Sequence, residues 1–329
     1  MKTTAIANAN IALIKYWGKR NEKLILPQNG SISMTCDNLS TTTTVEFSDK
    51  YRKDTIIIND EELKNDEKNI LGYLERIRKM AGIKDYAKIV SESNFPIATG
   101  LASSASGFAA LTLASVKASG LELNEKDLTI LTRQGSGSAC RSICEGFVEW
   151  YRGKREDGSD SYAKSIAPKN YWCNFTMIIS VVTKAKKKVS SRVGMSQTVK
   201  TCPYYKCWLK TIDYDLNIIR NGILQKDFTL VGQTAEYNCL KMHALIITTK
   251  PSIIYWTPAT MKIINSVHLW REQGLECYFT IDAGSNVIII CLDKNIKEIN
   301  KRLLELDGVI KTIICKPGDG AKLIDKHLF

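Results

Sequence analysis

The chain has 329 residues, 44% of them hydrophobic and 24% charged, which fits a soluble globular protein of two domains. No run approaches the roughly 18 apolar residues of a transmembrane helix, so membrane-spanning helices are excluded and no membrane partner is expected. The net charge of +12 suits a polyanionic small molecule, whereas scattered basic residues without zinc-finger spacing argue against a nucleic-acid partner.

The first half of the chain alternates β-branched runs with helical patterns. Residues 4–14 predict a first strand rather than a signal peptide, because Lys15 follows a short apolar run and no A-x-A cleavage pattern is present. We therefore expect a cytoplasmic protein. Further strands are predicted at 41–47, 55–58, 86–91 and 175–182. Helices are predicted at 66–80, with Asn65 as its N-cap, at 124–134 and at 139–144. Another helix is predicted to follow a serine-rich loop and to end at about residue 117.

The second half of the chain has a different texture. Its patterns predict helices at 204–221, 227–242, 258–271 and 294–306, and strands at 278–282, 286–291 and 309–315. We place the domain boundary in the lysine-rich stretch 184–188. One domain is therefore expected over residues 1–185 and a second over 186–329.

The ten cysteines form no CxxC pair, which disfavours a zinc site. Disulfides are rare in the cytosol. If a bridge forms, Cys202 and Cys207 are the expected partners, because both lie in a polar segment.

Residues 96–107 (PIATGLASSASG) form the most informative segment, a small-residue loop between a strand-like run and an apolar helical pattern. Glycine and short side chains let backbone N–H groups approach an anion, and the following helix N-terminus adds free donors. The loop is therefore a candidate phosphate-binding site. It is neither a Walker loop nor a GxGxxG fingerprint, so on these residues alone the serines could equally well only cap a core helix.

Two further segments are rich in polar groups. Residues 10–20 (NIALIKYWGKR) place two lysines, a tyrosine and an asparagine where they could bind a multiply charged phosphate, although a solvated strand end is the alternative. In residues 136–142 (SGSACRS), Arg141 is expected in the first turn of a short helix, where the dipole disfavours a cation. An arginine fits there if it binds an anion such as a carboxylate, and an ordinary surface arginine is the alternative.

Asp282 lies in residues 278–286 (YFTIDAGSN), within a predicted apolar strand and beside a glycine turn. A buried aspartate loses hydration energy unless it is paired or functional, whereas an aspartate that starts a turn is common. The three histidines suggest no Ser-His-Asp arrangement, so a carboxylate is the better candidate to position or deprotonate a hydroxyl. Residues 189–195 (VSSRVGM) are as compatible with a lid or phosphate clamp as with a linker.

Taken together, these segments resemble the GHMP kinase superfamily and, within it, the mevalonate diphosphate decarboxylase family. The likeness covers the chain nearly end to end, and its motifs stand in the family order. They are residues 10–20, 26–33 (LPQNGSIS), 94–109 (NFPIATGLASSASGFA), 135–142 (GSGSACRS), 241–244 (KMHA) and 282–286 (DAGSN).

The resemblance implies an α+β fold of the GHMP kinase type, with a ribosomal-protein-like N-terminal domain, a ferredoxin-like C-terminal domain and a site in the cleft. It implies a lyase of the mevalonate pathway of isoprenoid biosynthesis. Such an enzyme uses ATP and Mg²⁺ to convert (R)-5-diphosphomevalonate to isopentenyl diphosphate, CO₂, ADP and phosphate, and we expect a homodimer. The alternatives are relatives that decarboxylate the monophosphate or only phosphorylate carbon 3, and, more remotely, a non-catalytic basic module.

The resemblance also implies roles for individual residues. Asp282 would orient or deprotonate the carbon-3 hydroxyl, Lys15 would stabilise charge, and Arg141 would hold the departing carboxylate. Ser104 would lie near the γ-phosphate and Mg²⁺. The ATP phosphates are assigned to Gly100, Leu101, Ala102, Ser103, Ser104, Ala105 and Ser106. Substrate binding is assigned to Asn10, Tyr16, Trp17, Gly18, Lys19, Ser136, Gly137, Ser138, Ala139, Cys140, Arg141, Ser191 and Arg192. A basic residue common in the family has no clear counterpart, with Lys68 adjacent and Asn69 in the expected position.

Overall fold

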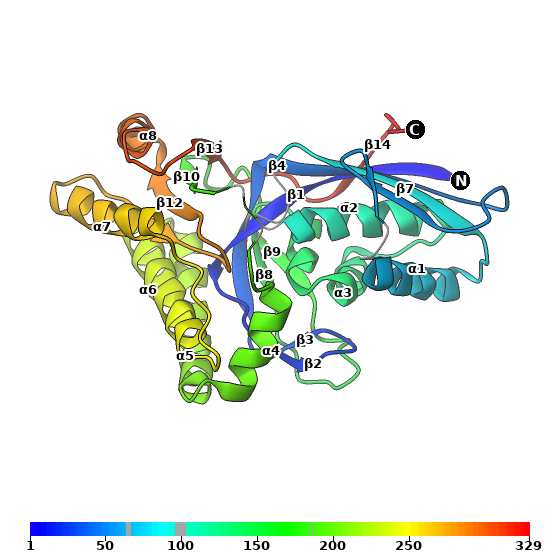
Figure 1. Ribbon diagram of the computed structural model, residues 1–329, viewed down its shortest axis with the longest axis horizontal. Helices are drawn as coiled ribbons and strands as arrows, with labels where there is room; N and C mark the ends of the chain where they lie inside the picture. The colour runs from blue at the N-terminus through cyan, green and yellow to red at the C-terminus, as the bar shows by residue number, and fades with distance from the viewer. Residues whose placement is uncertain (64–66, 96–102, 184, 186) are drawn as a thin grey trace.

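The computed structural model describes residues 1–63, 67–95, 103–183, 185 and 187–329. These residues form two large β-sheets and a short hairpin, with helices packed against the large sheets (Figure 1). Strand β1 runs from the first sheet into the region where the two halves meet (Figure 1). Its C-terminal end is therefore well placed to share a site with the second half of the chain.

The first sheet has the strand order β14-β1-β4-β7-β5-β6, and β8 and β9 extend it from β4. Neighbouring strands are antiparallel except β5 and β7, which are parallel. The strands are β1 (Lys2–Ile14), β4 (Ser31–Ser48), β5 (Thr55–Ile58), β6 (Glu61–Glu62), β7 (Tyr86–Ser93), β8 (Phe147–Trp150), β9 (Ala163–Ala167) and β14 (Lys322–Ile324). A separate hairpin joins β2 (Lys19–Asn21) to β3 (Leu26–Pro27).

Helix α2 lies directly on β1 and β4, with α1 and α3 beyond it on the same side of the sheet (Figure 1). The close approach is possible because the helix carries small buried residues, among them Ala109, Ala110 and Ala114. The helical elements of this half are α1 (Glu67–Ala81), α2 (Ser103–Ala118), α3 (Glu125–Gly135) and the 3₁₀ turn η1 (Gly137–Ile143).

The second sheet is antiparallel, with the order β11-β12-β10-β13. Its strands alternate between two cores: Ile178 and Ile289 pack with α7 and α8, whereas Ile179 and Ile290 pack with α5 and α6. The elements are β10 (Phe175–Val181), β11 (Tyr278–Thr280), β12 (Val287–Leu292), β13 (Lys311–Cys315), α4 (Ser191–Thr201), α5 (Tyr205–Gln225), α6 (Phe228–Ile247), α7 (Pro258–Glu272), the 3₁₀ turn η2 (Asp293–Asn295) and α8 (Ile296–Leu304).

Most predicted elements are confirmed to within a few residues, and the α+β class is confirmed. Two differences matter for the site. Strand β11 ends at Thr280, so Asp282 lies in the turn after the strand rather than within it. The short helix predicted at 139–144 is a 3₁₀ turn that holds Arg141 in its last turn rather than its first, so the argument from the helix dipole was wrong. The predicted Asn65 cap lies outside the described residues.

No bridge joins Cys202 and Cys207, the pair expected if a disulfide formed, because all ten cysteines are free. Cys202 is buried at the C-cap of α4, where its Sγ lies 3.2 Å from Thr248 Oγ1, whereas Cys207 is exposed on α5. A polar neighbourhood in the sequence did not reveal that the two side chains face different surroundings. The boundary near residue 185 stays a prediction; β10, which precedes it, pairs with β12 and β13 of the second sheet. None of the described helices combines the length and the apolar character needed to cross a membrane.

Candidate active site

A buried ion pair joins the end of β1 to the turn after β11. Lys15 Nζ lies 2.6 Å from Asp282 Oδ1 and donates to Ala12 O at 2.9 Å. The Lys15 side chain is 2% exposed and that of Asp282 is 25% exposed, so the carboxylate is the accessible member of the pair. A buried ammonium is costly unless it is paired, and Asp282 supplies the partner. The structure therefore brings together two residues predicted for the site, and the carboxylate of Asp282 is the group that a ligand hydroxyl can reach.

Arg141 is buried near this pair. Its Nε donates to Ser33 Oγ at 2.9 Å and Asn10 Oδ1 at 3.2 Å, and its Nη1 donates to Ser31 Oγ at 2.5 Å. Burial lowers the pKa of the Arg141 guanidinium, and the neighbouring Cys140 and Asp282 oppose that shift. Among the ion pairs of the described residues, none involves Arg141. A buried guanidinium held by hydroxyl and amide oxygens suits a ligand carboxylate.

Asn10 connects Arg141 to the 3₁₀ turn η1. Its Oδ1 accepts from Arg141, while its Nδ2 donates to Ser138 O at 3.0 Å and Ser142 Oγ at 2.8 Å. Both ends of the amide are used, so its orientation is determined. The other predicted residues of this turn lie around it, with Ser136 half-buried and Gly137, Ala139 and Cys140 buried.

The Tyr16 phenol stands beside the same turn. Its ring packs edge-on against Trp150 at 4.7 Å, and its buried OH has no hydrogen-bond partner among the described residues. Burial raises the pKa of Tyr16 well above its usual value, so the OH remains a donor. A Cβ at Gly137 would lie 2.9 Å from Trp150 Cη2 and 3.1 Å from the Tyr16 oxygen, so a larger residue there would displace this ring pair. The orphaned donor fits a ligand with acceptor oxygens.

The residues after Tyr16 connect β1 to the β2–β3 hairpin. Gly18 has φ +107°, and a Cβ there would lie 2.0 Å from Tyr205 OH, which donates to Trp17 O at 2.6 Å. The Trp17 side chain is buried in the core, and its backbone N–H donates to Asn29 Oδ1 at 3.4 Å. Lys19 Nζ pairs with Glu22 Oε2 at 2.6 Å.

Arg192, a residue predicted to bind substrate, lies on helix α4 and contacts α1. Ser190 caps the helix by accepting from Val193 N, so that Ser191 and Arg192 stand in its first turn. Arg192 Nη1 donates to Asn69 Oδ1 at 2.7 Å. Asn69 is the position where the sequence comparison expected a basic residue, and here it contacts a cation from elsewhere in the chain.

The candidate phosphate loop is only partly described. Residues 96–102, which include Gly100, Leu101 and Ala102, lie outside the described residues. Ser104 is exposed in the first turn of α2 and Ala105 is buried. Ser106 Oγ is buried and lies 2.7 Å from Thr41 Oγ1, so it anchors the helix to β4. The assignment of this loop to ATP phosphates stays a prediction.

The structure adds Lys187 to the neighbourhood of Asp282. Lys187 Nζ donates to Ala283 O at 2.9 Å, and burial lowers the pKa of this lysine while Asp282 opposes the shift. A cation beside an accessible carboxylate suits an anionic group that approaches both. The sequence could not distinguish this lysine, because it stands in a run of basic residues at 184–188 that resembles a solvated segment.

His243 on α6 predicts how stability depends on pH. Its Nε2 lies 3.2 Å from Ile281 O, and burial lowers its pKa to about 4. In the unfolded chain His243 therefore binds a proton below about pH 6.5, whereas in the folded protein it binds one only below about pH 4. The free energy of unfolding should fall by up to about 3 kcal/mol as the pH drops through this window.

Urea unfolding of the wild type and His243→Gln between pH 7 and pH 4.5 checks this prediction. The variant should lose less stability over the window, because glutamine does not titrate. Carboxylates titrate in both proteins, so only the difference between the two curves reports on His243. Parallel curves would contradict the assignment.

Known proteins show the same arrangement of sequence and fold. Residues 7–163 match the model of the diphosphomevalonate decarboxylase-like N-terminal domain, and residues 177–317 match that of the mevalonate 5-diphosphate decarboxylase C-terminal domain. The diphosphomevalonate decarboxylase of Ganoderma lucidum is 38% identical over 91% of this chain and 80% of its own length. The crystal structure of mevalonate diphosphate decarboxylase from Staphylococcus aureus is 41% identical, with a TM-score of 0.92 over 98% of each chain. A structure of MDDEF in complex with MVAPP, AMPPCP and magnesium is 38% identical, with a TM-score of 0.92 over 99% of each chain.

Proposed function

Because this chain belongs to the diphosphomevalonate decarboxylase family, we propose that it converts (R)-5-diphosphomevalonate and ATP to isopentenyl diphosphate, CO₂, ADP and phosphate. The observation that carries this proposal is the accessible Asp282 carboxylate, paired with buried Lys15 and close to a buried Arg141 that has no carboxylate partner in the described residues. The solved relative with MVAPP, AMPPCP and magnesium supports ATP and Mg²⁺ as the companions of the substrate. The fold is the two-domain architecture of these decarboxylases.

Asp282 is proposed to receive the proton of the carbon-3 hydroxyl as that oxygen attacks. ATP supplies the phosphoryl group, and Mg²⁺ offsets its charge. Lys15 orients the carboxylate at 2.6 Å and contributes positive charge where negative charge develops. Phosphoryl transfer depends on such positioning and electrostatics more than on covalent chemistry, so a carboxylate fixed by its ion pair with Lys15 fits the step.

Arg141 is proposed to hold the substrate carboxylate. After phosphorylation, the bond between carbon 3 and its oxygen breaks and phosphate departs with the electron pair. The carboxylate then leaves as CO₂, and the electrons of its C–C bond form the double bond of the product. A guanidinium held by Ser31, Ser33 and Asn10 presents a fixed direction to the carboxylate, so this bond stays aligned with the departing oxygen.

The diphosphate is assigned to a second set of donors. Tyr16 OH, Lys19 and the Arg192 guanidinium at Asn69 supply donors of the required kind. The loop from Gly100 to Ser106 is assigned to the ATP phosphates, with Ser104 nearest the metal. A homodimer in the cytoplasm is also part of this proposal and rests on the family likeness; light scattering and cell fractionation test it.

The decisive assay measures ADP and CO₂ release with mevalonate 5-diphosphate and, separately, with mevalonate 5-phosphate. The proposal expects both products in a one-to-one ratio from the diphosphate. Preference for the monophosphate would identify a monophosphate decarboxylase. Formation of ADP without CO₂ would identify a carbon-3 kinase.

Arg192→Ala tests the diphosphate end. We expect the KM for the diphosphate substrate to rise about tenfold with kcat little changed, because a charge-assisted contact to the bound phosphates is lost. Steady-state kinetics at saturating ATP measure the effect. Arg155→Ala is the matched control, since Arg155 is an exposed arginine that pairs only with nearby Asp157 among the described ion pairs. A fall in kcat at unchanged KM would contradict the assignment.

A further inference from the structure

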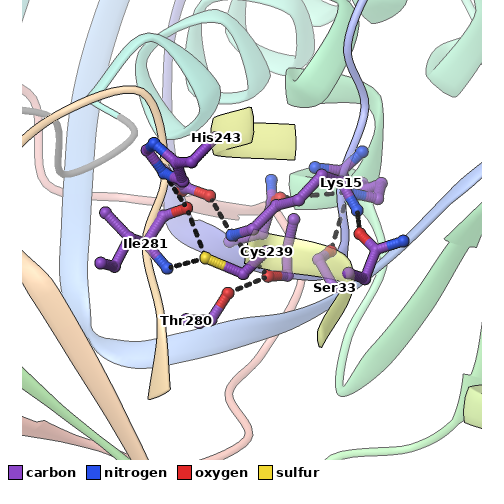
Figure 2. Close-up of polar contacts among 11 residues, drawn as sticks. Lys15, Ser33, Cys239, His243, Thr280 and Ile281 are labelled. Carbon is purple, nitrogen blue, oxygen red and sulfur yellow. Dashed lines mark hydrogen bonds and ion pairs between the residues drawn. The ribbon is translucent and has the colours of Figure 1, made fainter. Parts of the chain in front are cut away.

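Helix α6 contacts the backbones of both segments that carry the Lys15–Asp282 pair. Asn238 Oδ1 accepts from Lys15 N at 2.9 Å. On the next residue, Cys239 Sγ accepts from Ile281 N at 3.1 Å and donates to Ile281 O at 3.5 Å. Figure 2 shows the Cys239 sulfur and the His243 ring both directed at Ile281, with Lys15 nearby. One helix therefore holds the residue before Asp282 and the backbone of its partner.

Ile281 needs these contacts because the sheet does not supply them. Strand β11 ends at Thr280, yet Ile281 is fully buried and its backbone groups must find partners. Cys239 and His243 stand four residues apart, which puts them on one face of α6. His243 Nε2 lies 3.2 Å from Ile281 O and must donate, since a carbonyl only accepts. Two side chains thus replace the missing strand partner.

The protonation states keep these contacts intact at neutral pH. Burial raises the pKa of the Cys239 thiol to about 11, so the sulfur keeps its proton and can donate. Burial lowers the pKa of His243 to about 4, so the ring is neutral. The α6 side chains facing Ile281 therefore carry no charge. The charges close to them are those of Lys15 and Asp282.

The helix side chains are themselves held in place. Asn238 Nδ2 donates to Asp215 Oδ2 at 2.6 Å, and the same oxygen accepts from Lys241 Nζ at 2.6 Å. The His243 ring packs against Trp256 with centroids 4.9 Å apart. These contacts restrain the rotamers that reach Lys15 and Ile281.

We propose that α6 sets the position of the Asp282 carboxylate relative to Lys15, with Cys239 and His243 as positioning residues for the proton transfer. This inference rests on the proposed function, because it assigns a role to residues around the same carboxylate. Neither side chain has to touch the substrate. They act through the backbone of Ile281, and a displacement of about 1 Å at a reacting group can cost about 10²-fold in rate.

Cys239→Ala tests the proposal, with Cys239→Ser as the conservative variant and Cys291→Ala as the matched control. Cys291 is an equally buried cysteine in β12, and within the described part of the chain no hydrogen bond joins it to Ile281 or Asp282. We expect Cys239→Ala to lower kcat about 10- to 100-fold while KM for both substrates stays within about twofold. The serine hydroxyl can accept from Ile281 N and donate to Ile281 O, so Cys239→Ser should recover most of the rate.

Hydrogen exchange gives a second measure that does not depend on turnover. The peptide spanning residues 278–286 should exchange faster in Cys239→Ala than in the wild type or Cys291→Ala, because the Ile281 N–H loses its acceptor. If Cys239→Ala does not fold, the same measurements are made on His243→Gln and His243→Leu. The glutamine variant should have the higher kcat, because its side chain can still donate to Ile281 O. A wild type without ADP and CO₂ release would contradict the proposed function, whereas unchanged exchange would contradict the positioning role.

Three kinetic results would overturn the inference for a working wild type. The first is an equal kcat for Cys239→Ala and Cys291→Ala. The second is a change in KM for Cys239→Ala with kcat unchanged. The third is a kcat for Cys239→Ser as low as that of Cys239→Ala. Each would mean that Cys239 contributes packing without orienting Asp282.

Discussion

Replacing Asp282 by asparagine should lower kcat by about 10²- to 10⁴-fold while nucleotide affinity stays near that of the wild type. The amide has almost the shape of the carboxylate and keeps an oxygen for Lys15 Nζ, which lies 2.6 Å away. It cannot take the proton of the substrate hydroxyl. Single-turnover measurements of ADP and CO₂ release give the rate, and titration with a fluorescent ATP analogue gives the affinity.

The variant also removes the negative charge beside a buried ammonium, which can destabilise a protein by about 3–5 kcal/mol. Thermal unfolding must therefore accompany the kinetics. The double variant Lys15→Met with Asp282→Asn separates the two effects, because no unpaired charge remains. It should recover stability and stay inactive. Turnover at the wild-type rate in Asp282→Asn would contradict the assignment of Asp282 as the proton acceptor.

The contacts that assemble the site show where sequence patterns stop being informative. Strands such as β10 and β12 follow from their β-branched runs, since burial on both faces imposes an apolar pattern on consecutive residues. Lys15 and Asp282 were selected by residue type and by the family likeness. Their ion pair joins positions 267 residues apart, and no local periodicity reports such a contact.

The role of α6 could not be predicted for a similar reason. Asn238, Cys239 and His243 are buried on α6, and only the structure shows that they face the backbone of Lys15 and Ile281. Nor does the pattern indicate that β11 stops at Thr280, because Ile281 is as apolar as the strand residues before it. The strand end and its replacement partners depend on tertiary packing, which propensity does not encode.

Arg141→Lys provides the complementary prediction, because it changes the group assigned to the second chemical step. Arg141 spreads its contacts over Ser31, Ser33 and Asn10, and a lysine has no planar fork with which to keep them and hold a carboxylate. We expect kcat/KM to fall about 10²-fold, the effect of misplacing the carboxylate by about 1 Å. In single-turnover experiments ADP should form faster than CO₂, since Asp282 and Lys15 remain.

Arg220→Lys is the matched control for this variant. Arg220 makes a two-point contact with Glu149, with Nε–Oε2 and Nη2–Oε1 distances of 2.8 and 2.7 Å, and no hydrogen bond or ion pair of the described residues joins either one to Asp282. Its replacement loses a similar planar geometry but should leave ADP and CO₂ release equal in rate. If ADP and CO₂ were released at equal rates in Arg141→Lys as well, the assignment of the substrate carboxylate to Arg141 would be contradicted. The separation of the two products in time therefore decides whether Arg141 acts on the group that leaves as CO₂ or only supports the fold of the turn η1.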